Sequence, residues 1–282
     1  MITNATAKTI IVIGHINHDR IWHLTEPLRA GGRIAWRARE ARLGGGGYFT
    51  ARRLLDFGHR VRILSNLMAD DAGRKAMISL ADTGFDTSLI TEREGETDFA
   101  DILLDPTGER TILSNERRLA RTFALAEPAT ADAFYINGPH LSDTVRQSLD
   151  AAPLVISQLP LRDGGPRAAD VIVGSKADMP GKALSVIWEE AKALAGVRLR
   201  HLVMTDGPDP TSIFDGETEQ RIPVPLHVNV RDTIGAGDTF SGALLDGLLK
   251  GREITSATLD ASRSTAEWLL QREAMFTEIS NQ

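Results

Sequence analysis

Residues 232–240 read Asp-Thr-Ile-Gly-Ala-Gly-Asp-Thr-Phe, and a run of small and apolar residues follows at 241–245. The run predicts a helix, and Gly235 and Gly237 let the backbone before it turn tightly with its N–H groups uncovered. Donors gathered at the N-terminus of a helix can bind an anion. Asp238, in the first turn of this helix, would face a phosphate held there and suits a base that deprotonates an attacking hydroxyl group. The spacing alone also fits a plain glycine turn followed by an N-terminal helix Asp.

The alternation of strands and helices along the chain predicts the fold class. Short β-branched runs alternate with helical stretches, which indicates an α/β fold whose parallel sheet is covered on both faces. The expected strands are residues 9–14, 60–64, 133–137, 153–157, 171–173 and 202–205, and the expected helices include 48–57, 72–83, 142–152 and 182–195. Residues 32–39 and 97–113 break the alternation. Both segments are typical of antiparallel strands with one face in water.

Composition limits the classes of function. The chain has 282 residues, of which 42% are hydrophobic, so we expect one α/β domain over residues 1–282 with a substantial core. The net charge of −6 and the pI near 5.7 argue against a nucleic-acid partner. The sequence has no cysteine, no signal-peptide pattern at its N-terminus and no apolar run near the ~20 residues of a membrane span. These features predict a cytoplasmic protein without a membrane partner.

Residues 232–240 resemble the signature of the ribokinase-like (pfkB-type) carbohydrate kinases, in which a D-T-x-G-A-G-D-x-F segment precedes a long helix. The resemblance implies that the backbone of Gly235, Ala236 and Gly237 forms an anion hole and that Asp238 is the catalytic base. Segments similar to the family's other motifs follow the family's order along the chain and lie at residues 14–19, 44–47 and 203–207.

The resemblance also implies an architecture. The family's fold is a three-layer α/β sandwich with a central, mostly parallel sheet and a small β lid, which places lid strands at about residues 20–40 and 95–115. The same lid often forms a dimer interface in the family. Ile34 and Trp36 would then be buried either by a second copy of the chain or by their own domain.

The substrate side of the resemblance rests on the segment after the first strand and on the glycine cluster. The family's corresponding Asp binds sugar hydroxyls, which assigns that role to Asp19, with Asn17 as a second contact; without the resemblance both residues fit an ordinary turn. Gly45 and Gly46 keep backbone N–H groups close to a ligand. The family pattern G-G-x-G-x-N places a sugar-binding Asn where this chain has Phe49. Phe49 is therefore either an apolar pocket wall, which would suit a nucleoside or a sugar acid, or a core residue.

The nucleotide side of the resemblance involves three residues. Thr205 and Gly207 match the family's nucleotide-side turn at the end of a late strand. Thr233 and the backbone around it lie where members bind nucleotide or a monovalent cation. The resemblance thus implies an ATP site close to the anion hole.

The metal side departs from the family. The N-x-x-E motif, which orders the water shell of magnesium, should follow the strand at 171–173, but residues 174–178 read Gly-Ser-Lys-Ala-Asp. Asp178 could stand in at a shifted position and Lys176 could balance phosphate charge, or the segment is simply an exposed loop. The metal ligands therefore stay unassigned, and a relative with slow or lost catalysis is an open alternative.

The predicted function is an ATP-dependent kinase that transfers the γ-phosphoryl group to a hydroxyl of a carbohydrate or a sugar-like metabolite. Its expected cofactors are ATP and Mg²⁺, with a monovalent cation as a further candidate, and its expected partners are a small-molecule substrate and a second copy bound through the lid. The alternatives are a nucleoside kinase and a non-catalytic sugar- or nucleotide-binding regulator on the same fold. The sequence names neither the sugar nor the position that is phosphorylated.

Overall fold

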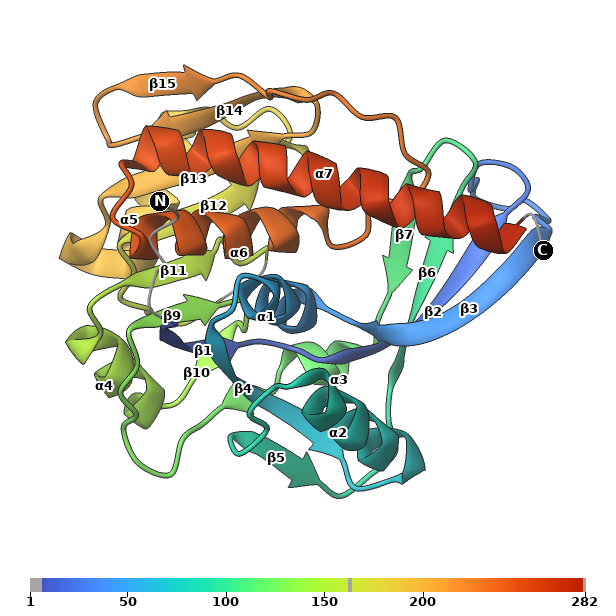
Figure 1. Ribbon diagram of the computed structural model, residues 1–282, viewed down its shortest axis with the longest axis horizontal. Helices are drawn as coiled ribbons and strands as arrows, with labels where there is room; N and C mark the ends of the chain where they lie inside the picture. The colour runs from blue at the N-terminus through green and yellow to red at the C-terminus, as the bar shows by residue number, and fades with distance from the viewer. Residues whose placement is uncertain (1–6, 162–163, 281–282) are drawn as a thin grey trace.

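The computed structural model describes residues 7–161 and 164–280, and these form a three-layer α/β structure (Figure 1). The central layer is a nine-stranded sheet with the order β15-β14-β13-β12-β11-β9-β1-β4-β5. All neighbours in it are parallel except β13–β14 and β14–β15, which are antiparallel. The strands are β1 (Thr9–Ile13), β4 (Arg60–Met68), β5 (Ile90–Arg93), β9 (Ala133–Ile136), β11 (Val155–Gln158), β12 (Val171–Ser175), β13 (His201–Asp206), β14 (Asp209–Phe214) and β15 (Glu219–Ile222).

Helices cover both faces of this sheet because its central strands are apolar on both sides. Ile10 and Val12 of β1 pack in the same apolar cluster as α1 (Gly46–Asp56), α2 (Asp71–Thr83), α6 (Ala236–Leu249) and α7 (Ile254–Ser280). Ile11 and Ile13, the alternate residues of the same strand, pack on the opposite face with α4 (Asp143–Ala151) and α5 (Leu184–Ala195). The two-residue period of the strand thus divides one buried run between two separate cores.

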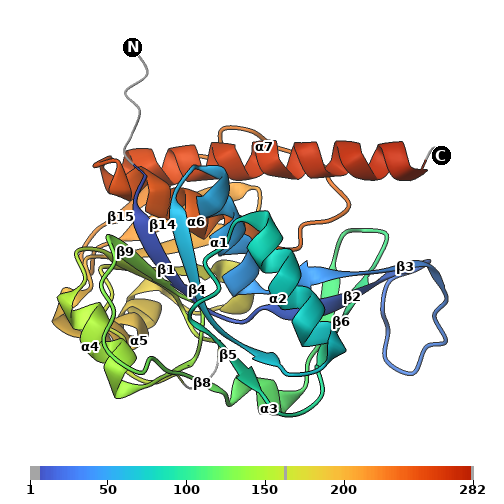
Figure 2. The same ribbon diagram turned by 60° about the horizontal axis from the view of Figure 1, so that its bottom comes forward.

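A second sheet lies outside the main one, with the order β3-β2-β6-β7. It consists of β2 (Asn17–Leu24), β3 (Trp36–Gly44), β6 (Phe99–Leu104) and β7 (Arg110–Leu113), which extend away from the main body beyond α1 (Figure 1, Figure 2). Its buried side contributes Ile21, Ile102 and Leu104 to a small apolar cluster, whereas Trp36, Ile112 and Leu113 are about half exposed. Two shorter elements connect these sheets, α3 (Glu116–Leu119) and the β8–β10 pair (Thr122–Phe123 with His140–Leu141).

The strand order reverses at β1, and this reversal positions the site. From β1 the chain first builds outward through β4 to β5, and it later returns to β9 on the other side of β1 before building out to β13. The connections on the two sides therefore diverge at the carboxyl ends of β1 and β9. In open α/β sheets such a reversal creates a crevice that binds ligands.

The structure extends the sequence-based description in three places. Asn17 and Asp19, which without the family resemblance fit an ordinary turn, belong to β2 (Asn17–Leu24), in which Ile21 and Leu24 are buried. The expected strand at 32–39 begins only at Trp36 and continues to Gly44. The hairpin of β14 and β15 and the 27-residue helix α7 had no clear signal in the sequence.

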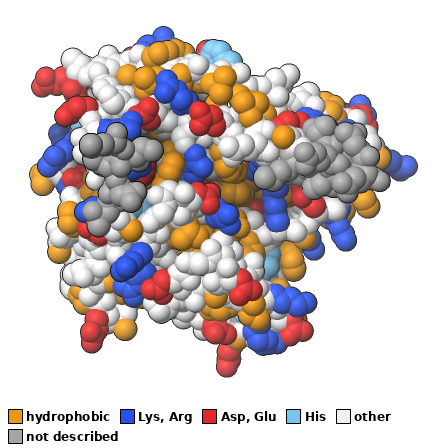
Figure 3. All heavy atoms as spheres, in the orientation of Figure 1, with side chains coloured by type: hydrophobic (Ala, Val, Ile, Leu, Met, Phe, Trp, Pro, Cys, Tyr) orange, Lys and Arg blue, Asp and Glu red, His pale blue; other side chains and the backbone are white. Residues whose placement is uncertain are grey.

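The surface carries both signs of charge. On the face shown in Figure 3, Lys and Arg side chains lie among Asp and Glu side chains. Within the described residues, none of the helices is long and apolar enough to cross a membrane.

Asp70 offers a test of how α2 is joined to the second sheet. Its carboxylate caps α2 by accepting the Gly73 N–H at 2.8 Å, and it also accepts the Thr97 N–H at 2.7 Å just before β6. Burial alone would raise the pKa of Asp70, but these hydrogen bonds lower it to about 2. We expect Asp70→Ala to lower the free energy of unfolding at neutral pH by about 1 kcal/mol or more.

Because the folded pKa lies below the ordinary value of 3.8, this stability is present above that value and is lost as the pH falls toward 2. Urea unfolding between pH 7 and pH 2.5 measures both effects. The control is Asp71→Ala, which removes the exposed neighbouring carboxylate paired with Arg74. Equal losses for Asp70→Ala and Asp71→Ala would contradict the capping role.

Candidate active site

The loop before α6 has the backbone geometry of an anion site. Residues 232–238, named here the anion loop, lead into α6, which begins at Ala236. Gly235 occupies the N-cap position with a φ of 84°, in the left-handed region that favours glycine. This conformation turns the chain sharply, and N–H groups of the first helical turn can face a ligand. The Ala236 N–H, however, donates to the Thr233 carbonyl oxygen at 3.1 Å within the turn. Gly237 is exposed there, and a Cβ atom at this position would meet open space.

Asp238 lies in the first turn of α6 and is partly buried. Its backbone oxygen accepts a hydrogen bond from the Thr50 hydroxyl at 3.0 Å, which ties the turn to α1. The amide nitrogen of Asn137 lies 3.5 Å from Asp238 Oδ1. Burial raises the pKa of the Asp238 carboxyl to about 6, although the nearby charge of Arg110 opposes this rise. A carboxylate with that pKa can accept a proton at neutral pH far better than an ordinary surface Asp.

The glycine cluster at residues 44–47 brings three polar side chains together at the N-terminus of α1. A Cβ atom at Gly44 would lie 1.9 Å from Asp19 Oδ2, one at Gly45 would lie 2.8 Å from Asn17 Cγ, and one at Gly46 would lie 2.3 Å from Asn137 Nδ2. Glycine is needed at each position because any side chain would collide with these groups. Asp19, Asn17 and Asn137 therefore converge on the same stretch of backbone.

Two of these side chains can offer acceptors to a hydroxylated ligand. Asn17 Oδ1 is buried and has no hydrogen-bond partner within the described residues. Asp19 is 2% exposed and lies against Gly44. A buried acceptor without a partner is costly, and a ligand hydroxyl would remove that cost. The predicted substrate residues Asn17, Asp19, Gly45 and Gly46 thus lie side by side.

The sequence analysis missed Asn137, which connects the two halves of the site. It follows β9 directly, at the strand reversal, and lies between the glycine cluster and Asp238. Arg167, only 1% exposed, holds the next two residues by donating to the backbone oxygens of Gly138 at 2.9 Å and Pro139 at 2.5 Å. A polar residue after a strand at a reversal of strand order was the signal that could have identified Asn137.

Phe49 lies in an apolar cluster with Ile21, Ile102 and Ile234, and it is 8% exposed. Its ring packs against the anion loop, because a Cβ atom at Gly235 would lie 2.6 Å from Phe49 Cγ. This placement favours the core-residue alternative for Phe49 over a wall of the substrate pocket. It also explains why Gly235 must lack a side chain.

The second sheet contacts the anion loop directly. Arg110 of β7 donates to the Thr233 hydroxyl at 3.1 Å. Arg42 of β3 donates to Asp232 Oδ2 at 2.9 Å. The turn between β6 and β7 also approaches, since a Cβ atom at Gly108 would lie 3.5 Å from the Arg231 carbonyl oxygen. Thr233 therefore lies under the second sheet, with a guanidinium on its hydroxyl.

The predicted nucleotide-side residues lie at the carboxyl ends of β12 and β13. The Thr205 hydroxyl donates to the Gly174 carbonyl oxygen at 3.2 Å, and Gly207 has a φ of 56° in the turn that follows. Lys176 Nζ lies 3.2 Å from Asp206 Oδ2. Asp178 is exposed, and in the described residues no group of three or more His, Asp or Glu side chains could hold a metal ion.

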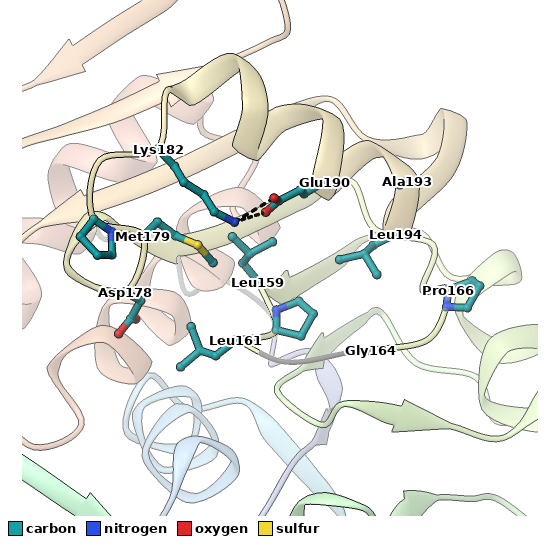
Figure 4. A pocket seen from close by; sticks show the side chains of 12 residues that line it. Leu159, Leu161, Gly164, Pro166, Asp178, Met179, Lys182, Glu190, Ala193 and Leu194 are labelled. Carbon is teal, nitrogen blue, oxygen red and sulfur yellow. Dashed lines mark hydrogen bonds and ion pairs between the residues drawn. The ribbon is translucent and has the colours of Figure 1, made fainter.

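A surface cavity of about 790 Å³ lies beside α5, away from the anion loop (Figure 4). Its described lining includes Leu159, Met179 and Leu194, and the Lys182–Glu190 ion pair, with an N–O distance of 2.8 Å, lies across it. Asp178 belongs to this lining. Of the lining residues that the structure describes, none comes from the anion loop or from the glycine cluster.

The chain is similar to known proteins in sequence and in fold. Residues 171–279 match the pfkB family carbohydrate kinases. A stretch of 56 residues is 43% identical to the ribokinase of Lactococcus lactis subsp. lactis (strain IL1403), a match that spans 20% of this chain and 18% of that protein. The chain thus matches about a fifth of the length of this curated relative.

Two solved structures show the extent of the fold. The nucleoside kinase of Burkholderia thailandensis, solved in complex with inosine, has a TM-score of 0.73 at 18% identity over 91% of this chain and 89% of that chain. Arabidopsis thaliana ribokinase, complexed with ribose and ATP, has a TM-score of 0.68 at 17% identity over 93% and 92%. The chain is ribokinase-like in fold and carries the pfkB-type pattern over residues 171–279. The predicted family resemblance and fold class are confirmed.

Gly46→Ala tests the convergence at the glycine cluster. Its Cβ atom would lie within 2.4 Å of Asn137 Nδ2, Cγ and Oδ1, so the Asn137 side chain or the backbone must move. We expect the free energy of unfolding to fall by about 1–3 kcal/mol, as for an overpacked core site. The control, Gly165→Ala, places a Cβ atom in open space and should be nearly neutral. Denaturant unfolding of both variants is the measurement, and equal stabilities would contradict the tight packing of Asn137.

Proposed function

We propose that this protein is an ATP-dependent kinase that transfers the γ-phosphoryl group to a hydroxyl of a sugar or a sugar-like metabolite. The observation that carries the proposal is the link from Asn17 and Asp19 through Asn137 to Asp238. One end of this chain of contacts offers acceptors for substrate hydroxyls, and the other holds a carboxylate beside an anion-binding helix terminus. Phosphoryl transfer to an alcohol needs both, held in one fixed geometry.

Each part of the site has a role in this reaction. Asp238 accepts the proton of the attacking hydroxyl, and Asn137 orients its carboxylate. The backbone N–H groups at Gly235 and Gly237 bind the transferred phosphoryl group as its charge develops, and the Ala236 N–H, which donates to the Thr233 carbonyl oxygen in the structure, would have to turn to join them. Arg110, whose charge already acts on Asp238, adds positive charge from the second sheet. The second sheet excludes water by lying over the loop.

The positions of the nucleotide and of its metal ion are part of this proposal. The ends of β12 and β13, with Thr205 and Gly207, would bind ATP beside Thr233. Mg²⁺ neutralises phosphate charge when bound with ATP, and it usually needs only one or two protein carboxylates in addition to the phosphate oxygens. The absence of a three-residue metal cluster in the described residues fits that mode. Lys176 would bring a further positive charge to this edge of the sheet.

A specific observation supports each of two alternative functions. The likeness to a nucleoside kinase is as close as that to ribokinases, so a nucleoside is a second candidate substrate. The missing N-x-x-E motif favours a non-catalytic binding protein. ATP turnover excludes the latter, and a thermal-shift screen of sugars, sugar acids and nucleosides separates the substrate classes because binding stabilises the folded state.

Replacing Asp238 distinguishes a kinase from a non-catalytic binding protein. We expect Asp238→Asn to lower kcat by about 10²-fold or more with the best ligand of the screen, because it removes the base but keeps the shape. In the wild type, kcat/KM should rise with pH and level off above the carboxyl pKa of about 6, and this limb should disappear in the variant.

ADP release and calorimetric titration of both proteins are the measurements. The folded pKa of about 6 lies above the ordinary 3.8, so the native state is destabilised by the charged carboxylate above pH 6. Asp238→Asn should therefore melt no lower than the wild type at pH 7. A variant that keeps most of the wild-type rate would disprove the proposed mechanism.

We further propose that a second copy of the chain binds the exposed side of the second sheet. Trp36 and Leu113 are both 54% exposed there, which is unusual for large apolar side chains on strands. Trp36 contacts Trp22, whose indole donates to Asp101, the residue opposite Leu113. Sedimentation equilibrium should show a dimer that Trp36→Glu dissociates, with Val197→Glu, at an exposed position on the main domain, as the control. A monomer at micromolar concentration would exclude this partner.

A kinase that consumes ATP also fits the cytoplasmic location expected from the sequence.

A further inference from the structure

Two arginines from distant parts of the chain hold the anion loop from behind. Arg42 of β3 and Arg272 of α7 both donate to Asp232 Oδ2. The side chain of Asp232 is 3% exposed, and those of Arg42 and Arg272 are 24% and 12% exposed. The other carboxylate oxygen, Oδ1, accepts the Ile234 N–H at 2.8 Å. The carboxylate is therefore fully engaged with the protein.

Arg272 also fixes the peptide bond that leads into the anion hole. Its Nη1 donates to the Ile234 carbonyl oxygen at 2.5 Å, while its Nη2 donates to Asp232. In a trans peptide the carbonyl and the following N–H point in opposite directions. A carbonyl of Ile234 held toward Arg272 therefore directs the Gly235 N–H away from it. One guanidinium thus sets the orientation of a donor at the N-cap of α6.

Aromatic rings keep this guanidinium in place. Its central carbon lies 5.1 Å from the centre of the Trp268 ring and 5.9 Å from that of the Phe49 ring. Cations are attracted to ring faces at such distances. Phe49 also packs against Gly235. Arg272, Phe49 and the anion loop therefore form one packed unit, and this is the reason for an aromatic residue at position 49.

We propose that Arg272 is a positioning residue that replaces a monovalent cation behind the anion loop, so that the protein works without K⁺ or Na⁺. The inference rests on the proposed kinase function. The resemblance to the ribokinase-like kinases implied a candidate cation near Thr233, but the residues present do not fit one. A cation needs oxygen ligands, and Asp232 and the Ile234 carbonyl already accept guanidinium hydrogen bonds. Two guanidinium charges would also repel it.

The wild-type protein gives the first test. We compare its melting temperature and its affinity for ADP with MgCl₂ in KCl, NaCl and choline chloride at equal ionic strength. We expect the same melting temperature in all three salts and affinities within about twofold, because no cation site is left to fill. A higher melting temperature or a several-fold tighter ADP affinity in KCl than in choline chloride would overturn the proposal.

Variants give the second test. Arg272→Ala should bind ADP about tenfold or more weakly, since a charge-assisted hydrogen-bond pair is lost, and millimolar guanidinium chloride should restore part of the affinity. Arg272→Lys keeps the charge but lacks the planar guanidinium that spans Asp232 and the Ile234 carbonyl. Its affinity for ADP should therefore lie between those of the wild type and Arg272→Ala. The control is Arg231→Ala, which breaks a more exposed ion pair, 2.6 Å to Glu273, between the residue just before the anion loop and the same helix.

The outcomes separate this proposal from the kinase function. If the wild type binds no ADP in any salt, the kinase proposal fails, while the salt dependence of its melting temperature still decides whether a cation site exists. Wild-type ADP affinity in Arg272→Ala would overturn the positioning role. So would an equal loss in Arg231→Ala, because the effect would then come from the loop–helix contact in general. If Arg272→Ala does not fold, Arg272→Lys and the wild-type salt series decide the question.

Discussion

The close approach of the backbone at residues 44–47 to three polar side chains is the constraint on which the site depends. Asp19 comes from β2, Asn137 from the end of β9, and the glycines form the last residue of β3 and the start of α1. These elements can meet only because no Cβ atom separates them. The strand reversal at β1 brings the same elements to one crevice, so the fold and the glycines act together to place the acceptors of the proposed substrate site beside Asp238.

Much of this arrangement could be predicted from the sequence because it depends on local signals. Buried β-branched runs identified the central strands, and the glycines at 235 and 237 identified the anion loop before α6. Asn137 and Arg272 could not be found in this way. Asn137 acts through contacts with residues about 90 and 100 positions away, and Arg272 lies in a long helix where an arginine is ordinary. Their roles arise only from tertiary contacts.

Phe49 shows how one substitution in a family pattern can change meaning once the structure is known. In the sequence it replaces a polar sugar contact, which suggests an altered substrate. In the structure its ring packs against Gly235 and lies 5.9 Å from the guanidinium carbon of Arg272, so it supports the anion loop. A residue that differs from the family pattern at a sugar-contact position therefore packs against the neighbouring anion loop. By itself it says little about the substrate.

The two carboxylates of the anion loop lie in different electrostatic environments. Asp232 is buried, and burial raises the pKa of its carboxyl, an effect that Arg42 opposes. Arg42 and Arg272 make the ionised form of Asp232 tolerable behind the loop. In front of the loop, the carboxylate of Asp238 has, among the residues that the structure describes, Asn137 alone within hydrogen-bond distance, and the more distant charge of Arg110. Two carboxylates six residues apart thus have opposite environments. The paired carboxylate fixes the backbone, and the other has a pKa at which it can exchange a proton, as the proposed phosphoryl transfer to a hydroxyl would require.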